Sequence, residues 1–204
     1  MFLYPLTDNT ENEMKPTVIG IVANWGAGKD TCCDYLRDTK GFVKVGFSDP
    51  LYEILWEMNP RLRLNYDAIN NEYRDEVTSY GVDAVKRMYP EVRHWLQALG
   101  QKAREIHGDN CWVDALDRRV RYSPRVAIRD VRHTNEIDYI RSRGGFIVHV
   151  ESNRAPDRDQ SHASEQLIFA DHADYTVQNN GTLVELYRQL DVILADWNNS
   201  GVNE

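Results

Sequence analysis

Small residues, glycines and one lysine follow an apolar run in the stretch VIGIVANWGAGKDT, Val18 to Thr31. Phosphate-binding loops have the pattern G-x-x-x-x-G-K-[ST], which follows a strand and opens a helix. Gly28 and Lys29 match this pattern, whereas Ala23 replaces its first glycine. Glycines let backbone N–H groups turn toward phosphate oxygens, and a helix start adds partial positive charge. The stretch therefore predicts a triphosphate site formed by Gly26, Ala27, Gly28, Lys29, Asp30 and Thr31.

Asp30 is the unusual residue of this loop because it stands where the pattern has a hydroxyl. A carboxylate beside a triphosphate is repelled unless a cation or an arginine lies between them. We expect Asp30 to meet Mg²⁺ through water and Thr31 to supply the hydroxyl to an inner phosphate. The alternative is a glycine-rich turn without a ligand, and the lysine and the strand–helix context argue against it.

A second acidic residue ends the apolar run RVAIRD, Arg125 to Asp130. An aspartate at the end of a buried strand is the expected partner of a phosphate loop, because it holds Mg²⁺ through the hydration shell of the ion. An acid at a strand end is common by itself, so the prediction depends on both motifs together. They predict Asp30 and Asp130 as metal-binding residues, with Lys29 and Asp130 in catalytic roles.

The elements that must position these residues alternate between strand and helix patterns. Apolar runs predict strands at 17–23, 42–47, 125–131, 145–150 and 174–179. Helical patterns predict helices at 29–39, 50–57, 92–107, 112–121, 135–143 and 182–197. The last of these has leucines and valines at three- and four-residue spacing. Such alternation is typical of the α/β class, with a mostly parallel sheet and helices on both faces.

Two segments interrupt the alternation and set the predicted domain organisation. Residues from about 58–92 are rich in charges and tyrosines and are expected to be an insertion, while the polar stretch 151–165 is expected to be an exposed loop. Residues 1–16 form an N-terminal arm in this interpretation, and 17–204 form a single domain.

The composition limits the function classes. The chain has 204 residues and a formal net charge of -8, which disfavours direct nucleic-acid binding. Cys32, Cys33 and Cys111 form no disulfide or metal-binding pattern, and no run of residues is apolar enough to cross a bilayer. We therefore expect a cytoplasmic protein without membrane contact.

Beyond single motifs, the sequence contains an ordered set of six segments: GKDT, GFSDPLYEIL, VRHWLQALGQKAREIHGDNCWVDAL, IRDVRHTNEIDYI, HASE and NNGTLVEL. Together they resemble the bacteriophage deoxynucleoside monophosphate kinases over nearly the whole chain. The resemblance implies a P-loop kinase fold with a five-stranded parallel sheet. It also implies Mg²⁺-dependent phosphoryl transfer from ATP to a deoxynucleoside monophosphate, small-molecule nucleotides as partners, a monomer or a homodimer, and the host cytoplasm if the chain is phage-encoded.

The resemblance assigns a lid to the loop 151–165. Arg154 and Arg158 would place positive charge on the transferred phosphoryl group, and closure would exclude water. His162 and Glu165 belong to the HASE segment. The alternatives are solvated surface arginines and an ordinary helix start. By composition, the NNGT segment at 179–182 is a turn and a helix start. In similar kinases such a loop borders the ATP base, so the resemblance makes Asn179 an ATP-binding candidate.

The acceptor must be held by its phosphate and recognised at its base. Arg93 and Gln97 are four residues apart and share one helix face, which suits a phosphate and a base edge respectively. Arg104 and Arg132 are further phosphate candidates, and Asp49 and Glu136 are candidates to orient the sugar or cationic neighbours.

Several of these residues have plainer interpretations. Gln97 and Arg104 also fit an exposed helix face. Trp112 could stack on a base, but a tryptophan that begins an amphipathic helix usually belongs to the core. The tyrosines of the insertion, among them Tyr66, Tyr73, Tyr80 and Tyr89, pack in a core or close over a nucleoside.

Two other functions compete with nucleotide phosphorylation. A kinase of another small phosphorylated metabolite, such as dephospho-coenzyme A or phosphomevalonate, would share the architecture. A nucleotide-dependent switch would also need a phosphate loop, but it would need neither a lid nor an acceptor-sized insertion.

Overall fold

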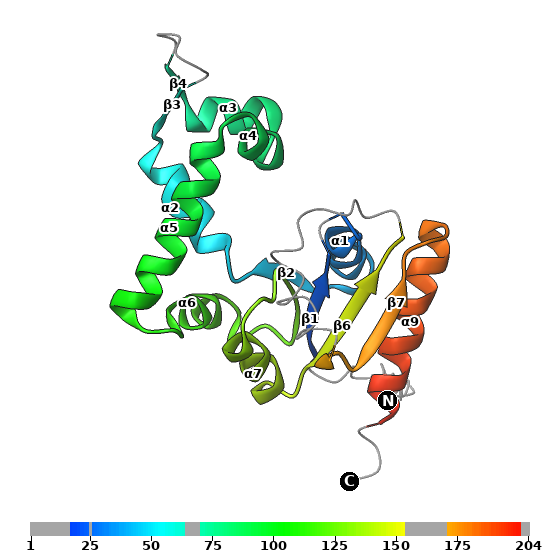
Figure 1. Cartoon of the computed structure of the whole chain (residues 1–204). Helices are drawn as coiled ribbons and strands as arrows, with labels where there is room; N and C mark the ends of the chain where they lie inside the picture. Colours follow the sequence, from blue (N-terminus) through cyan, green and yellow to red (C-terminus); the bar gives the residue numbers. More distant parts are fainter. Residues whose placement is uncertain (1–16, 25, 64–69, 154–170, 201–204) are drawn as a thin grey trace, which may run out of the picture.

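The computed structural model of the chain describes residues 17–24, 26–63, 70–153 and 171–200 (Figure 1). Within these residues, a five-stranded sheet has the order β2-β5-β1-β6-β7, and every neighbouring pair is parallel. Its strands are β1 (Thr17–Ala23), β2 (Val43–Gly46), β5 (Arg125–Arg129), β6 (Phe146–Glu151) and β7 (Tyr175–Gln178). The predicted α/β class with a five-stranded parallel sheet is confirmed.

Helices cover both faces of this sheet (Figure 1). One face packs against α1 (Lys29–Lys40) and α9 (Leu183–Asn199), and the other against α6 (Cys111–Val120) and α7 (Thr134–Ser142). Successive side chains of a strand point to opposite faces, so the apolar run of β1 supplies both cores. Ile19 and Ile21 belong to the first core, and Val18 and Val22 to the second.

A smaller core lies apart from the sheet (Figure 1). It is built by α2 (Asp49–Met58), the antiparallel pair β3 (Arg61–Arg63) and β4 (Asn70–Glu72), α3 (Tyr73–Tyr80), α4 (Val82–Met88) and the first turns of α5 (Pro90–His107). Leu62, Tyr73 and Tyr89 are fully or almost fully buried there. The core interpretation is thus confirmed for these two tyrosines, while Tyr66 lies outside the described residues.

The predicted elements occur with small shifts at their ends. One shift bears on the site, because β5 ends at Arg129 rather than at 131. Asp130 has φ 62°, in the left-handed region that few residues other than glycine adopt, so the backbone leaves the strand there. The arm 1–16 and most of the predicted lid lie outside the described residues. None of the helices that the structure describes is long and apolar enough to span a membrane.

Candidate active site

The predicted phosphate loop connects β1 to α1 at the carboxyl end of the strand. Gly26 and Gly28 have φ values of 80° and 105°, which only glycine adopts without strain. Gly28 caps α1 and offers no side-chain acceptor to the N–H groups of its first turn. Unpaired N–H groups at a helix start, together with the helix dipole, form a ready anion-binding site. The loop therefore has the backbone conformation that a phosphate site requires.

Asn179 braces this loop from the end of β7. Its Nδ2 donates a hydrogen bond to the Ala27 carbonyl at 2.8 Å. A Cβ added to Gly28 would lie 2.3 Å from the same nitrogen, so a glycine is needed there for close approach as well as for backbone freedom. Asn179 thus contacts the loop backbone, whereas the sequence predicted a place beside ATP itself.

Lys29 and Asp130 come together because β5 is the neighbour of β1 in the sheet. Lys29 Nζ lies 3.9 Å from Asp130 Oδ1 and 3.6 Å from Asp30 Oδ2. The hydroxyl of Ser48 donates to Asp130 Oδ2 at 3.0 Å. A non-glycine residue with positive φ costs about 1–3 kcal/mol and often marks a functional site. The strained backbone of Asp130 is consistent with the predicted role of this residue.

Arg129 is a central residue of the site that sequence analysis missed. Its Nη2 lies 2.5 Å from Asp49 Oδ1, and its Nη1 lies 3.6 Å from Asp30 Oδ1 and 3.9 Å from Asp130 Oδ2. Asp49 Oδ2 accepts the Gly46 N–H at 2.7 Å, so Asp49 holds a cationic neighbour, one of its two expected roles. The sequence does show a charged residue, Arg129, at the end of a buried strand. Its partners, however, come from three separate segments that the sequence does not bring together.

Lys44 completes the charge balance around Asp30. Its Nζ lies 3.3 Å from Asp30 Oδ1 and 3.0 Å from Asp34 Oδ1. Partial burial pushes the pKa of Asp30 up, but the adjacent ammonium groups and the Arg129 guanidinium outweigh it, so this pKa lies below its usual value. The cation that a carboxylate needs in a phosphate loop is therefore supplied by the protein itself.

The oxygen atoms at this site fit a small divalent cation. Asp30, Asp130 and Ser48 offer carboxylate and hydroxyl oxygens, the donors that Mg²⁺ prefers. In the described part of the chain, no group of three or more His, Cys, Asp or Glu side chains is arranged to hold a metal.

Three of the predicted acceptor residues meet where α5, α7 and the end of β5 approach one another. Arg104 Nη2 lies 3.0 Å from Glu136 Oε1, and Glu136 Oε2 accepts the N–H groups of Arg132 and His133 at 2.6 and 3.1 Å. Burial raises the pKa of Glu136 above its usual value, although these N–H groups and the nearby cations oppose the shift. Glu136 therefore fixes the start of α7 and holds a cationic neighbour.

The remaining predicted acceptor residues differ in exposure. Arg93 and Gln97 are exposed on α5, and their spacing places them on the helix face that also carries Arg104. Trp112 is only 7% exposed, and its indole N–H donates to the Gly100 carbonyl at 3.1 Å. This contact joins α6 to α5 and, with the burial of the indole, supports the core interpretation of Trp112, while base binding by this residue stays a prediction.

A second set of polar residues that the sequence did not reveal lies on the smaller region. Lys86 Nζ of α4 lies 2.7 Å from Asp83 Oδ1 and donates to the Tyr52 hydroxyl at 3.2 Å. The hydrogen bond from Lys86 is the main cause that lowers the pKa of Asp83, and the charges of Lys29 and Asp30 also act on this carboxylate. The polar face of α4 therefore lies within electrostatic range of the phosphate loop.

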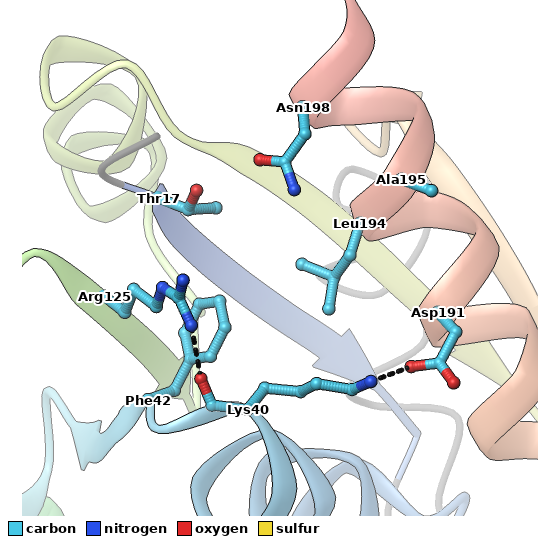
Figure 2. A pocket seen from close by; sticks show the side chains of 8 residues that line it. All are labelled: Thr17, Lys40, Phe42, Arg125, Asp191, Leu194, Ala195 and Asn198. Atoms are coloured by element: carbon cyan, nitrogen blue, oxygen red, sulfur yellow. Dashed lines mark hydrogen bonds and ion pairs between the residues drawn. The ribbon is translucent and has the colours of Figure 1, made fainter. Parts of the chain in front are cut away.

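A small pocket at the opposite end of the sheet is a different feature (Figure 2). It has a volume of about 200 Å³ and lies beside Thr17 and Arg125, the first residues of β1 and β5. Lys40 pairs with Asp191 at 2.8 Å, and Arg125 donates to the Lys40 carbonyl at 2.7 Å. Ligands of open α/β sheets bind at the carboxyl ends of the strands, so this pocket is not the candidate active site.

The predicted lid residues Arg154, Arg158, His162 and Glu165 lie outside the described residues. The site is therefore defined by the phosphate loop, the ends of β2 and β5 with their charges, and the facing residues of α4, α5 and α7. This loop, on a parallel sheet of this strand order, defines the class of P-loop kinases.

Comparison with known proteins narrows this class. The sequence model of the family "Deoxynucleotide monophosphate kinase" matches residues 89–190, which is half of the chain. The chain therefore belongs to the deoxynucleotide monophosphate kinase family, and it is a kinase that acts on nucleotides. A protein of Acanthamoeba polyphaga mimivirus, whose name marks it as a candidate kinase of this kind, is 28% identical over 196 residues, which cover 85% of this chain and 93% of the relative.

Similar solved structures are more distant. A shikimate kinase from Aquifex aeolicus is 11% identical with a TM-score of 0.44, and the match covers 90% of this chain and 99% of that one. A dephospho-CoA kinase from Campylobacter jejuni is 12% identical with a TM-score of 0.44, and the match covers 93% of this chain and 100% of that one.

Proposed function

We propose that the protein transfers the terminal phosphoryl group of ATP to a deoxynucleoside monophosphate in a Mg²⁺-dependent reaction. Family membership supports the substrate class. The observation that carries the reaction type is the approach of Lys29, in a loop of phosphate-binding conformation, to within 3.9 Å of Asp130. Phosphoryl transfer depends mainly on positioning and on positive charge around the moving group, and this arrangement provides both.

The ATP phosphates would lie against the backbone from Gly26 to Thr31. The N–H groups of the first turn of α1 would bind phosphate oxygens, and Lys29 would turn from the two carboxylates toward the outer phosphates. Asn179 would act on ATP indirectly, by holding the Ala27 carbonyl and with it the shape of the loop.

Mg²⁺ would be held beside the same phosphates by Asp130 and Asp30. When bound, the ion would neutralise charge on the phosphates and fix their orientation. Ser48 fixes one oxygen of Asp130 through its hydrogen bond, so the other oxygen remains directed toward Lys29 and the phosphate loop.

The acceptor would lie between the phosphate loop and the smaller region. We propose that the smaller region is the acceptor-binding part of a single kinase domain that spans 17–204. Arg132 and Arg93 carry exposed side chains on its sheet and helix sides, and Glu136 fixes Arg104 between them. Gln97, on the same helix face, would hydrogen-bond the base. Lys86 would contribute charge from α4, and Arg154 and Arg158 are proposed to act from a lid.

An acceptor panel tests this function. The protein is incubated with ATP and Mg²⁺ and with each of the four common deoxynucleoside monophosphates, and ADP formation is compared with a reaction without acceptor. We expect at least one deoxynucleotide to stimulate ADP formation, and we expect EDTA to abolish it. Turnover that no deoxynucleotide stimulates would overturn the proposed acceptor class, and equal turnover without any acceptor would favour a nucleotide-dependent switch.

A further inference from the structure

The carboxylate of Asp30 is held from two sides by different charges. Oδ1 faces Arg129 Nη1 at 3.6 Å and Lys44 Nζ at 3.3 Å, while Oδ2 faces Lys29 Nζ at 3.6 Å. Arg129 and Lys44 belong to β5 and β2, two strands of the sheet, whereas Lys29 belongs to the loop itself. The cations on Oδ1 therefore stay in place when Lys29 turns toward a phosphate.

We propose that Arg129 is a positioning residue that acts through Asp30. It neutralises charge on this carboxylate and fixes the position of its Oδ1, so that a phosphate loop with an aspartate in the hydroxyl position binds a polyphosphate. The inference rests on the proposed nucleotide site, but it does not depend on the identity of the acceptor. Without the guanidinium, Asp30 would repel the phosphates and compete with them for Lys29.

Arg129 is suited to this role because its own position is fixed. Asp49 Oδ1 pairs with Nη2 at 2.5 Å, and Asp49 Oδ2 is bound to the Gly46 N–H. A Cβ on Gly46 would lie 3.1 Å from both Arg129 Cγ and Asp49 Oδ1, so the glycine leaves the space that the pair occupies. The planar guanidinium donates in fixed directions, so holding one nitrogen on Asp49 aims the other at Asp30.

Lys44 does not replace Arg129 in this arrangement. Its ammonium group is shared with Asp34, at 3.0 Å, which is closer than its distance to Asp30. The long lysine stem is also more flexible than a guanidinium held at both ends. Once Lys29 binds phosphate, Arg129 is the cation on Asp30 whose orientation the surrounding structure fixes.

A double-mutant cycle tests the proposal through ADP binding, measured by calorimetric titration with no acceptor present. The variants are Arg129→Met, Asp30→Ser and the double variant. Coupled neighbours interact by up to a few kcal/mol, so we expect Arg129→Met to weaken ADP binding about 10-fold or more. In the Asp30→Ser background, where position 30 carries no carboxylate, the same change should weaken binding less than about 3-fold.

Two controls separate this role from others. Arg125→Met removes an arginine from the other end of β5 and should leave ADP affinity unchanged, since Arg125 binds the Lys40 carbonyl far from the loop. Arg129→Lys keeps the charge and should restore part of the lost affinity. Melting temperatures of all variants record any loss of stability.

Three results would overturn the proposal. An equal loss of ADP affinity in both backgrounds would mean that Arg129 contacts the nucleotide directly. Unchanged affinity with a lowered melting temperature would mean that Arg129 only stabilises the fold. Failure of the wild-type protein to bind ADP would refute the phosphate site itself, whereas binding of ADP without stimulation by any deoxynucleotide would refute only the proposed acceptor.

Discussion

The sheet region and the smaller region differ in how their functional residues are held. Around the phosphate loop, side chains come from the ends of three neighbouring strands, and almost every charge has a partner of opposite sign within 4 Å. In the smaller region, Arg93 and Gln97 are exposed on one helix, and the buried contacts below them are apolar. The first region is preorganised by the sheet, whereas the second depends on a small core of its own.

This difference fits the proposed roles of the two regions, in which the sheet would bind the nucleoside triphosphate and the smaller region would position the acceptor. Few buried apolar contacts and a separate core are features of segments that open more readily than the main core. Substitutions in the two regions should therefore have different consequences, and these can be ranked by the size of the expected effect.

The largest effect is expected from Lys29→Met. The change removes the mobile cation of the phosphate loop, and kcat should fall about 10³-fold, as when one donor to a charged transition state is lost. Lys40→Met is a matched control, because Lys40 ends the same helix and pairs with Asp191 at the other end of the sheet. Initial rates of ADP formation check the result, and near-normal turnover of the Lys29 variant would contradict the proposed site.

A pair of core substitutions tests the division between the regions. Leu36 and Leu62 are both fully buried, the first in the sheet core and the second in the smaller core, and replacement of either by alanine should cost about 2–5 kcal/mol. Leu62→Ala should speed amide hydrogen exchange in α3 and α4 and raise the acceptor KM while ADP binding persists. Leu36→Ala should weaken ADP binding and global stability together.

If Leu62→Ala raised amide hydrogen exchange equally in the sheet and in α3 and α4, the proposed separation of the two regions would be wrong. One cooperative core would then hold both regions, and the acceptor part would not open separately.

A smaller effect is expected from Gly28→Ala. A residue with a side chain is strained at φ 105°, by about 1–3 kcal/mol, and its Cβ would also meet Asn179. ADP affinity should therefore fall about 10-fold or more, which follows from the same range of strain energy. Gly108→Ala is the matched control, since Gly108 has φ 92° but nothing within 4 Å of an added Cβ. Equal ADP affinity in both variants would rule out a nucleotide role for the loop conformation.

The smallest effect is expected from Arg132→Met. The Arg132 side chain is exposed, and its backbone N–H continues to hold Glu136, so the fold should be unchanged. The acceptor KM should rise by about 10-fold, the value of one charge-assisted hydrogen bond, while the KM for ATP stays the same. Arg118→Met serves as the control, because Arg118 is also an exposed arginine but belongs to α6. If the KM for ATP rose instead, Arg132 would act on ATP rather than on the acceptor.

Much of the fold could be predicted because its signals are local. The buried runs of β1 and β5 and the glycines before Lys29 are contiguous in sequence, and each of the predicted helices occurs. The sequence left the role of Trp112 open, since an indole at a helix start suits both a core and a base, and only the structure shows that this side chain is buried. In the smaller region, β3, β4, α3 and α4 were not predicted because short helices and strands carry little periodicity.

The sequence by itself determined the phosphate loop, the strand that ends at Asp130 and the alternation that gives a parallel sheet, because these follow from side-chain size and apolar period along the chain. Only the tertiary structure decided that Arg129 pairs with Asp49 and faces Asp30, and that Glu136 holds Arg104. Such pairings depend on which strands become neighbours in the sheet. That order is set by packing between segments far apart in sequence, and no local pattern records it.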